Sequence, residues 1–316
     1  LMTNCIFYTN YLSKANWDTS AHGGGIAARN CSYNIANSLF EGNRVETRHY
    51  DASGGGVYLY GGSGVVSECI FTNLESRLDN YDGANGYGYG GAVYVGGSSD
   101  CLIHDCRFNN CRISGYPTTA RYGAAVFMSS GRLWRNIFDG NGSVYNGYAI
   151  SVISGSTCMN NCLVVRTVTE HGIGCLSGIP SVINCTICYA AGWGITNLVG
   201  ATPVIKNCIA WGNAGGGIGV NGLVTFSCSQ TPVMGDGNIN EDPLFTDNVF
   251  FHLKSRSGNY LNGYFSGGTW GKSINHSPCI DAGDPRDRRH KEPVSYTHLR
   301  AHETPEHLVC RLLLEK

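Results

Sequence analysis

Short runs of alternating apolar and polar residues return at regular intervals along this chain. One recurring phrase is a polar residue, a small residue that is usually Cys, any residue and then an apolar residue, as in Glu68-Cys69-Ile70-Phe71. The small residue falls at positions 5, 38, 69, 106, 136, 162, 185 and 208, so the spacing settles at 23 residues after values as large as 37. A spacing that varies only above a fixed minimum indicates one repeated coil with insertions, which is typical of a solenoid.

Three short strands are predicted in each coil. A Gly cluster followed by alternating apolar residues, as at 54–60, marks the first strand. An apolar pair such as Val65 and Val66 marks a second strand just before each Cys, and the Cys phrase itself marks the third. No long stretch has a helical period. Three short strands in a base period of about 23 residues predict an all-β fold, a parallel β-helix solenoid.

Stacked coils must bury the apolar positions, because a single coil is too thin to hold a core. We expect the inward positions of the Gly strands to be aliphatic, as at Val57, Leu59, Val93 and Val95. The repeated Cys is expected at one inward site per coil, as a ladder of small residues about 4.8 Å apart. Asn at the far end of the phrase, at positions 43, 73, 110, 141 and 213, is expected to form a turn in the left-handed region.

The 15 Cys residues also permit a disulfide framework or a zinc site. Seven of them lie on one apparent register, at 5, 69, 106, 162, 185, 208 and 228, and they do not form pairs at the usual ligand spacing. A reduced structural ladder is the preferred interpretation, with no metal and no cofactor. Ca²⁺ is an alternative at Glu241-Asp242 and at Asp281 with Asp284, where turns are the simpler explanation.

Composition argues against several classes of protein. The net charge is −1 and no basic patch is present, so we expect no nucleic-acid partner. No apolar run is long enough for a transmembrane helix. The 44 Gly residues suit a solenoid with many turns. We expect a monomer, with β-helix coils in residues 1–230 and a closing segment in 231–293.

Residues 294–316 differ in kind from the rest of the chain. Val294 to Thr304 and His307 to Glu315 match the translation of a transposon end and a sequencing adapter. We therefore expect 294–316 to be non-native and exclude them from any functional argument. The chain also begins inside a coil, so we expect natural sequence, with any signal and anchor, to lie outside this fragment.

The coil phrases resemble those of right-handed parallel β-helix proteins with the pectin-lyase-like fold. The Gly cluster at 54–58 followed by the Cys phrase at 69–73 is most similar to the repeats of bacterial polymorphic outer-membrane proteins. Residues 237–245 and 277–285 resemble the closing segment of large secreted bacterial β-helix proteins. This resemblance covers residues 1–285 and implies an extracellular or cell-surface location. It leaves activity open, because the fold hosts lyases, hydrolases, adhesins and stalks.

All insertions fall at one corner of the coil, between the Cys strand and the next Gly strand. Insertions at one corner of a solenoid build one surface, which is often the binding face. Beside them, Tyr58, Tyr94 and Phe127 are in register on the outward positions of the Gly strands. With Tyr89 and Tyr122 of the insertions, these rings are predicted to bind a polysaccharide or surface glycan. Stacked rings that only stabilise the sheet are the alternative. The insertions span 11–22, 44–53, 74–89, 112–122 and 142–147.

Candidate catalytic residues come from the same insertions. Asp51, Asp79 and Asp82 supply carboxylates, and Arg48 and Arg121 are candidate bases. Sugar hydrolysis needs two carboxylates about 5–10 Å apart, and β-elimination needs a base, usually with Ca²⁺. No acid repeats on the strands of adjacent coils. Glycan or surface binding is therefore the first hypothesis, a polysaccharide lyase or glycoside hydrolase the second, and a passive stalk the third.

Overall fold

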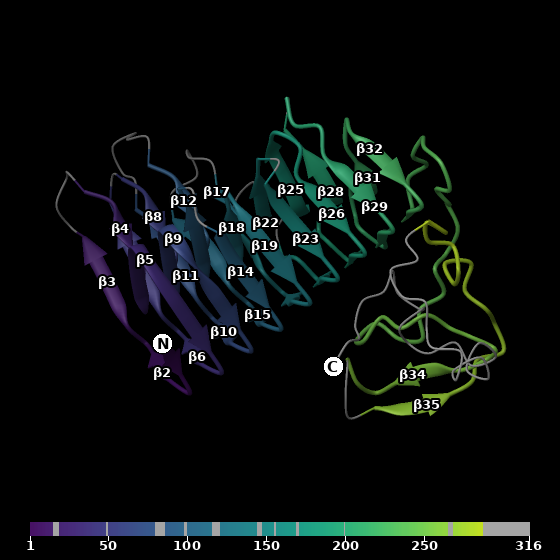
Figure 1. Ribbon diagram of the computed structural model, residues 1–316, viewed down its shortest axis with the longest axis horizontal. Coiled ribbons are helices and arrows are strands. Elements are labelled where there is room, and N and C mark those ends of the chain that lie inside the picture. The colour runs from purple at the N-terminus through teal and green to yellow at the C-terminus, as the bar shows by residue number, and fades with distance from the viewer. Residues whose placement is uncertain are drawn as a thin grey trace.

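The computed structural model describes residues 1–14, 19–48, 50–79, 86–97, 100–115, 121–143, 147–154, 156–168, 171–198, 200–264 and 268–286. Within these ranges the regular secondary structure is β-strand, without α-helix. Strands stack along the long axis of the molecule in sequence order (Figure 1). Pairing is parallel between neighbouring coils, as for β9 (Val57–Ser67) with β13 (Val93–Gly96). The predicted all-β parallel β-helix is confirmed.

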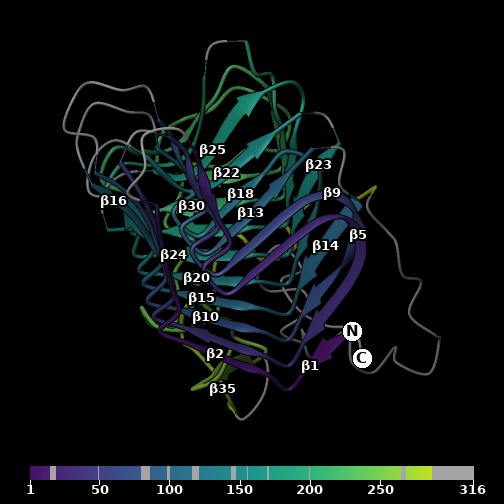
Figure 2. The same cartoon turned by 90° about the vertical axis from the view of Figure 1, so that its left-hand side faces the viewer.

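Three rows of strands run along the solenoid. The glycine row consists of β5 (Ile26–Ala36), β9, β13, β18 (Val126–Met128), β22 (Tyr148–Ile153), β25 (His171–Ser177), β28 (Trp193–Asn197) and β31 (Gly216–Gly219). The pre-cysteine row consists of β1 (Met2–Thr3), the second halves of β5 and β9, β14 (Asp100–His104), β19 (Gly131–Trp134), β23 (Thr157–Asn160), β26 (Ser181–Ile183), β29 (Val204–Lys206) and β32 (Leu223–Thr225). The cysteine row consists of β2 (Ile6–Tyr8), β6 (Leu39–Glu41), β10 (Ile70–Thr72), β15 (Arg107–Asn109), β20 (Ile137–Asp139), β24 (Leu163–Val165), β27 (Thr186–Cys188), β30 (Ile209–Trp211) and β33 (Cys228–Ser229). Since β5 and β9 curve through the first two rows, those rows join into one sheet (Figure 2).

The insertions contain regular strands that the sequence pattern did not reveal. A first insertion sheet consists of β3 (Tyr11–Lys14), β7 (Arg44–Thr47), β11 (Glu75–Leu78), β16 (Arg112–Gly115) and β21 (Gly142–Ser143). A second insertion sheet consists of β4 (Ala21–His22), β8 (Ala52–Ser53), β12 (Gly88–Tyr89) and β17 (Arg121–Tyr122). The two sheets pack together through Ala52, Leu78 and Ile113. Coils with these sheets are wider, whereas each coil from β22 to β33 has the three predicted strands.

The core lies between the three rows. Val57, Leu59, Val93 and Val95 are fully buried, as the alternation of the Gly strands predicts. A second buried column comes from the cysteine row, where Phe rings of successive coils stack with centroids between 4.6 and 4.8 Å apart. This column is continuous through the first five coils, and it consists of Phe7, Phe40, Phe71, Phe108 and Phe138.

The small residue of the Cys phrase forms a hydrogen-bonded ladder. Its side chain accepts a bond from the backbone N–H of the equivalent residue in the preceding coil. The N–H of Cys69 donates to Sγ of Cys106 at 3.4 Å, and the N–H of Cys106 donates to Oδ1 of Asn136 at 2.9 Å. The thiol also donates back along its own coil, as from Cys69 to the carbonyl of Ser67 at 3.1 Å. Cys, Ser and Asn alternate at this site because each is small and offers an acceptor.

The end of the ladder corrects one sequence assignment. Cys228 lies one residue past the ladder, and the hydroxyl of Ser227 accepts the N–H of Cys208 at 3.0 Å. Oδ1 of Asn238 then accepts the N–H of Ser227, also at 3.0 Å, which adds part of a further coil. The cysteines of the described residues are all free. The burial of the ladder cysteines Cys69, Cys106, Cys162, Cys185 and Cys208 agrees with the structural role predicted for them.

Asn at the far end of the phrase has two different roles. Asn73 and Asn110 have φ of 54° and 51°, which confirms the predicted left-handed turn. The prediction is wrong at Asn141, because the preceding Gly140 takes the positive φ, and positions 43 and 213 follow the same pattern. Oδ1 of the buried Asn141 instead accepts the N–H of Cys111 at 2.9 Å. These Asn residues therefore join neighbouring coils as a second ladder.

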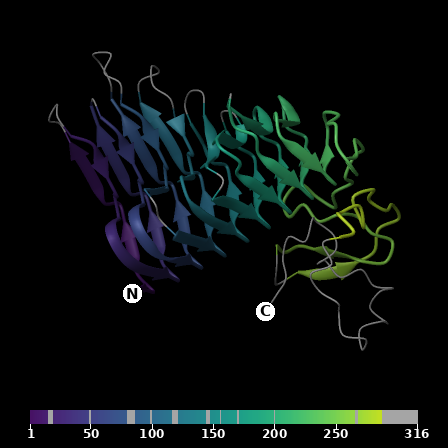
Figure 3. The same ribbon diagram turned by 45° about the horizontal axis from the view of Figure 1, so that its top comes forward.

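After β33 the chain folds back over the outer side of the cysteine row. Phe251 packs against Leu163 and Val165 there, and Arg166 donates a hydrogen bond from Nη1 to the carbonyl of Asn248 at 2.7 Å. The segment includes an antiparallel pair, β34 (Asn259–Leu261) and β35 (Thr269–Gly271). Figure 3 shows this pair beside the later coils. The insertion sheets and the closing segment thus cover different sides of the solenoid.

Candidate functional site

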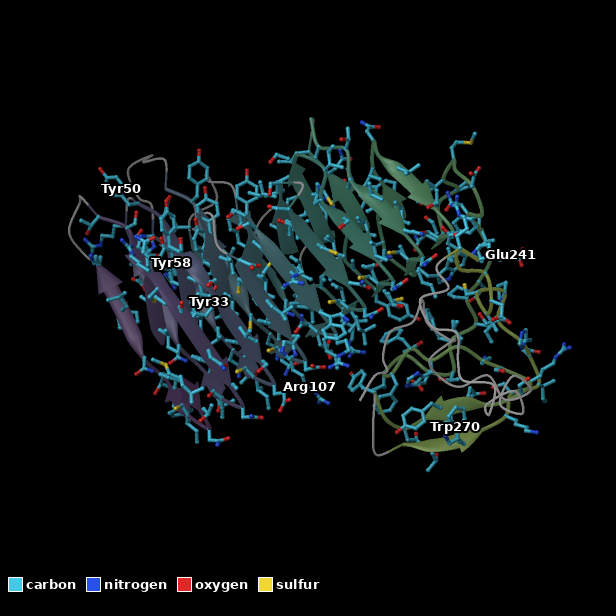
Figure 4. The ribbon with its side chains drawn as sticks, viewed as in Figure 1. Tyr33, Tyr50, Tyr58, Arg107, Glu241 and Trp270 are labelled. Atoms are coloured by element: carbon cyan, nitrogen blue, oxygen red, sulfur yellow. The ribbon has the colours of Figure 1, made fainter. Side chains whose placement is uncertain are left out.

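The second insertion sheet lies over the outer side of the glycine row and forms an aromatic cluster with it. The rings of His22 and Tyr58 have centroids 4.3 Å apart, and those of Tyr89 and Phe127 are 4.8 Å apart. In Figure 4, Tyr58 and Tyr50 lie toward one side of the early coils, and Arg107 lies toward the opposite side. We call this surface the insertion face, and define it by His22, Asp51, Tyr58, Tyr60, Tyr87, Tyr89, Tyr94, Tyr122 and Phe127.

The glycine-row rings are in register, as predicted, but they do not form an open platform. Tyr58 and Tyr94 stack at 4.9 Å, and Tyr94 and Phe127 stack at 5.2 Å, with planes within 6° of each other. Each ring therefore covers the face of the next ring. Tyr58 and Phe127 are only 5% exposed, because the second insertion sheet covers them. The expected exposure is wrong for these two residues, whose contacts match the sheet-stabilising alternative.

The accessible part of the insertion face is its rim. Tyr60 is 43% exposed and Tyr87 is 39% exposed, whereas Tyr89, Tyr94 and Tyr122 are half-buried. Tyr60 was not among the predicted binding residues, although it lies two residues after Tyr58 on the same face of the strand. This spacing of two residues along a strand was the sequence signal that could have identified Tyr60. A ligand would therefore contact the rims and hydroxyls of these tyrosines before the stacked column beneath them.

Burial controls the ionisation of the cluster. It raises the pKa of Tyr94 to about 12, so the phenol stays protonated and can donate a hydrogen bond. Burial also lowers the pKa of His22 to about 4, and the charges of Arg29 and Lys14 act in the same direction. The Arg29 guanidinium lies 5.2 Å from the centre of the Tyr58 ring. At neutral pH the cluster thus combines neutral phenols and a neutral imidazole with a nearby cation.

The depressed pKa of His22 predicts that acid weakens the insertion face. An unfolded His takes up a proton near its ordinary pKa of 6.5, whereas folded His22 does so only near pH 4. The stability that the neutral imidazole contributes is present above pH 6.5 and is lost as the pH falls toward 4. We expect the protection of backbone amides of β4 and β8 against hydrogen exchange, corrected for the intrinsic exchange rate at each pH, to fall over this interval. In the variant His22→Gln, the protection of these amides should depend less on pH. An unchanged pH dependence would contradict the role assigned to His22.

The structure brings one of the acidic candidates to the aromatic cluster. Oδ1 of Asp51 accepts the backbone N–H of Tyr87 at 2.8 Å, and burial raises the pKa of this carboxyl group. Asp79 instead accepts a hydrogen bond from Nε of Arg77 at 2.7 Å. Arg48 is exposed. Asp82 and the side chain of Arg121 lie outside the described residues, so their predicted roles stay predictions.

A row of charges on the first insertion sheet was not anticipated. Arg44, Glu75 and Arg112 are in register on three adjacent strands. Glu75 is 6% exposed, and its Oε1 accepts a hydrogen bond from Nε of Arg112 at 3.1 Å and another from the Ser114 hydroxyl. Burial alone would raise the pKa of Glu75, but these hydrogen bonds and the two arginines hold it below its usual value. The buried carboxylate is thus fully paired, as a structural contact requires.

Among the residues described here, no group of three or more His, Cys, Asp or Glu side chains is placed to hold a metal ion. These residues include Glu241, Asp242, Asp281 and Asp284, where Ca²⁺ was the alternative to a turn. In the same part of the chain, no helix is long and apolar enough to cross a membrane.

Comparisons with known proteins agree with this architecture. No curated protein and no solved structure matches the chain. A family model described as "Right handed beta helix region" matches residues 1–178, which is more than half of the 316 residues. The matched region contains the insertion sheets, the Phe column and most of the Cys ladder. The chain therefore belongs to the right handed beta helix region family, as a β-helix repeat protein.

Proposed function

We propose that this β-helix repeat protein is located outside the cell or on the cell surface and binds glycan through its insertion face. The observation that carries the proposal is the concentration of tyrosines on that face. Tyr60 and Tyr87 are exposed at its rim, and Tyr89, Tyr94 and Tyr122 are half-buried behind them. Aromatic rings combined with a few polar groups are typical of ligand sites, since rings supply contact area and hydroxyls supply orientation.

The resemblance to pectin-lyase-like proteins and to polymorphic outer-membrane repeats supports a surface location. It does not select one activity, because folds of this kind serve several functions. The phenols of Tyr89 and Tyr94 stay protonated at neutral pH, and a protonated phenol can both donate to and accept from a sugar hydroxyl. Uncharged donors beside the Asp51 carboxyl group are suited to a polyhydroxylated ligand.

Substitution at the rim tests the proposal. We expect Tyr60→Ala and Tyr87→Ala each to weaken binding of a glycan found on an array by on the order of tenfold, which is about 1.4 kcal/mol. The melting temperature should change little, because both side chains are exposed. Tyr8→Ala is the matched control, since Tyr8 is 61% exposed but lies on the cysteine row. Equal affinity in all four proteins would contradict binding at the insertion face.

A second candidate function is hydrolysis or β-elimination of a polysaccharide. The specific observation in its favour is that burial raises the pKa of Asp51, which is the direction of shift that a general acid needs. Incubation with neutral and uronic-acid polysaccharides separates the hypotheses. New reducing ends, or an unsaturated product that absorbs in the ultraviolet, would favour an enzyme if Asp51→Asn abolished them. If the protein neither binds nor cleaves any of these polysaccharides, the result would favour a passive stalk.

A further inference from the structure

One column of the glycine row changes character where the insertion sheets end. In the early coils it consists of Gly24, Gly55, Gly91 and Ala124, each two residues before the first inward aliphatic residue. A Cβ atom on Gly55 would lie 2.5 Å from the carbonyl oxygen of Glu75 in the first insertion sheet. A side chain is excluded at Gly55 because the neighbouring backbone is too close, and the one exception in the column, Ala124, has the smallest side chain.

In the later coils the same column carries large rings. Tyr148 stands two residues before Ile150, and its partner in the next coil is His171. The backbone N–H of Trp193 donates to Nδ1 of His171 at 2.9 Å, which places Trp193 one coil further along. The first insertion sheet ends at β21, so nothing from it occupies the space that these side chains take up. All three rings are half-buried.

Two of these rings lie across glycines of the outer surface. A Cβ atom on Gly174 would be 2.5 Å from Cγ of Tyr148, and one on Gly219 would be 2.8 Å from Cε3 of Trp193. The glycines therefore leave the space that the rings occupy. A ring packed across the backbone in this way turns its opposite face away from the sheet. The rings of Tyr148 and His171 lie 5.4 Å apart and are tilted by 38°, so they do not stack face to face as Tyr58 and its neighbours do.

We propose that Tyr148 and Trp193 form a second aromatic platform, on which further sugar units of the same ligand bind. This inference rests on the proposed glycan binding and deepens it. The ligand is then a polysaccharide chain that runs along the solenoid axis, rather than a short oligosaccharide. Tyr148 lies in the coil that directly follows that of Phe127, so the platform comes next to the insertion face along the solenoid axis. The two rings lie two coils apart, which is about 10 Å along the axis.

The dependence of affinity on chain length tests this platform. A glycan that binds the full-length protein is cut into fragments of graded length, and the affinity for each is measured. We expect affinity to rise with length in the unmodified protein. Trp193→Ala and Tyr148→Ala should bind short fragments normally and long fragments on the order of tenfold more weakly. Trp134→Ala is the control, because Trp134 is 36% exposed on the pre-cysteine row.

A second measurement guards against a folding defect in these variants. Trp193→Phe keeps a ring, so it should retain affinity for long fragments while it loses the fluorescence change that binding causes in the unmodified protein. If the unmodified protein binds glycan but both alanine variants match it at every length, the platform is overturned and the insertion face stands. If the unmodified protein binds no glycan of any length, the proposed function itself fails.

Discussion

Replacing Phe108 by alanine is expected to lower the free energy of unfolding by about 3–5 kcal/mol, the range for deleting a buried Phe ring. Phe108 is fully buried, and its ring stacks on Phe71 and on Phe138 at 4.7 Å each. Alanine would leave a cavity between two rings that rigid neighbouring coils hold apart. The backbone ladders fix the distance between coils, so the structure cannot close the gap by collapse. Urea unfolding followed by circular dichroism measures the loss.

The position along the column provides the control. Among the described residues Phe7 stacks on one ring, that of Phe40, and it is partly buried, so Phe7→Ala should cost clearly less. Since each repeat contacts only its neighbours, unfolding of a solenoid need not be two-state, and the comparison is between midpoints measured under identical conditions. Equal losses at Phe7 and Phe108 would mean that stacking on both faces adds nothing to burial alone.

The architecture could be predicted because the sequence pattern repeats once in every coil. Val57 and Leu59 recur as Val93 and Val95 at equivalent positions, so period and inward face follow from the alternation. The strands of the two insertion sheets could not be predicted from the sequence, for a physical reason. β8 and β12 have two residues each, which is too short for an alternating pattern to appear. They are strands only because equivalent segments of neighbouring coils lie beside them.

The candidate site was predictable in part. The register of Tyr58, Tyr94 and Phe127 follows from the repeat, and the structure confirms it. Their burial does not follow, because the rings that cover them come from the separate second insertion sheet. The proposed platform at Trp193 could not be predicted either, because the position of the Trp193 ring depends on the space that Gly219 leaves in the next coil. A repeat defines what lies above and below a residue, but not what folds over it.

The Cys ladder adds a chemical requirement to this picture, and Asn136 tests it. Asn136 is fully buried; it accepts the N–H of Cys106 and donates from Nδ2 to the carbonyl of Ile103, both at 2.9 Å. Asn136→Ala would leave both backbone groups buried without a partner, at a cost of about 1–3 kcal/mol for each. We therefore expect a total loss of stability of about 2–6 kcal/mol in urea unfolding, against a smaller loss if only size mattered.

Conservative variants at Asn136 distinguish hydrogen bonding from packing. Ser38, at the equivalent site, accepts the N–H of Cys5 at 3.2 Å and donates to the carbonyl of Ala36 at 2.8 Å, two residues before it. Asn136→Ser should keep the first bond and lose only the contact to the preceding coil's carbonyl. The expected order of stability is therefore Asn, then Ser, then Ala. If Ser and Ala were equally destabilising, only the size of the side chain would matter at this site. The predicted order would instead mean that Cys, Ser and Asn occupy the ladder because each supplies an acceptor that joins one coil to the next.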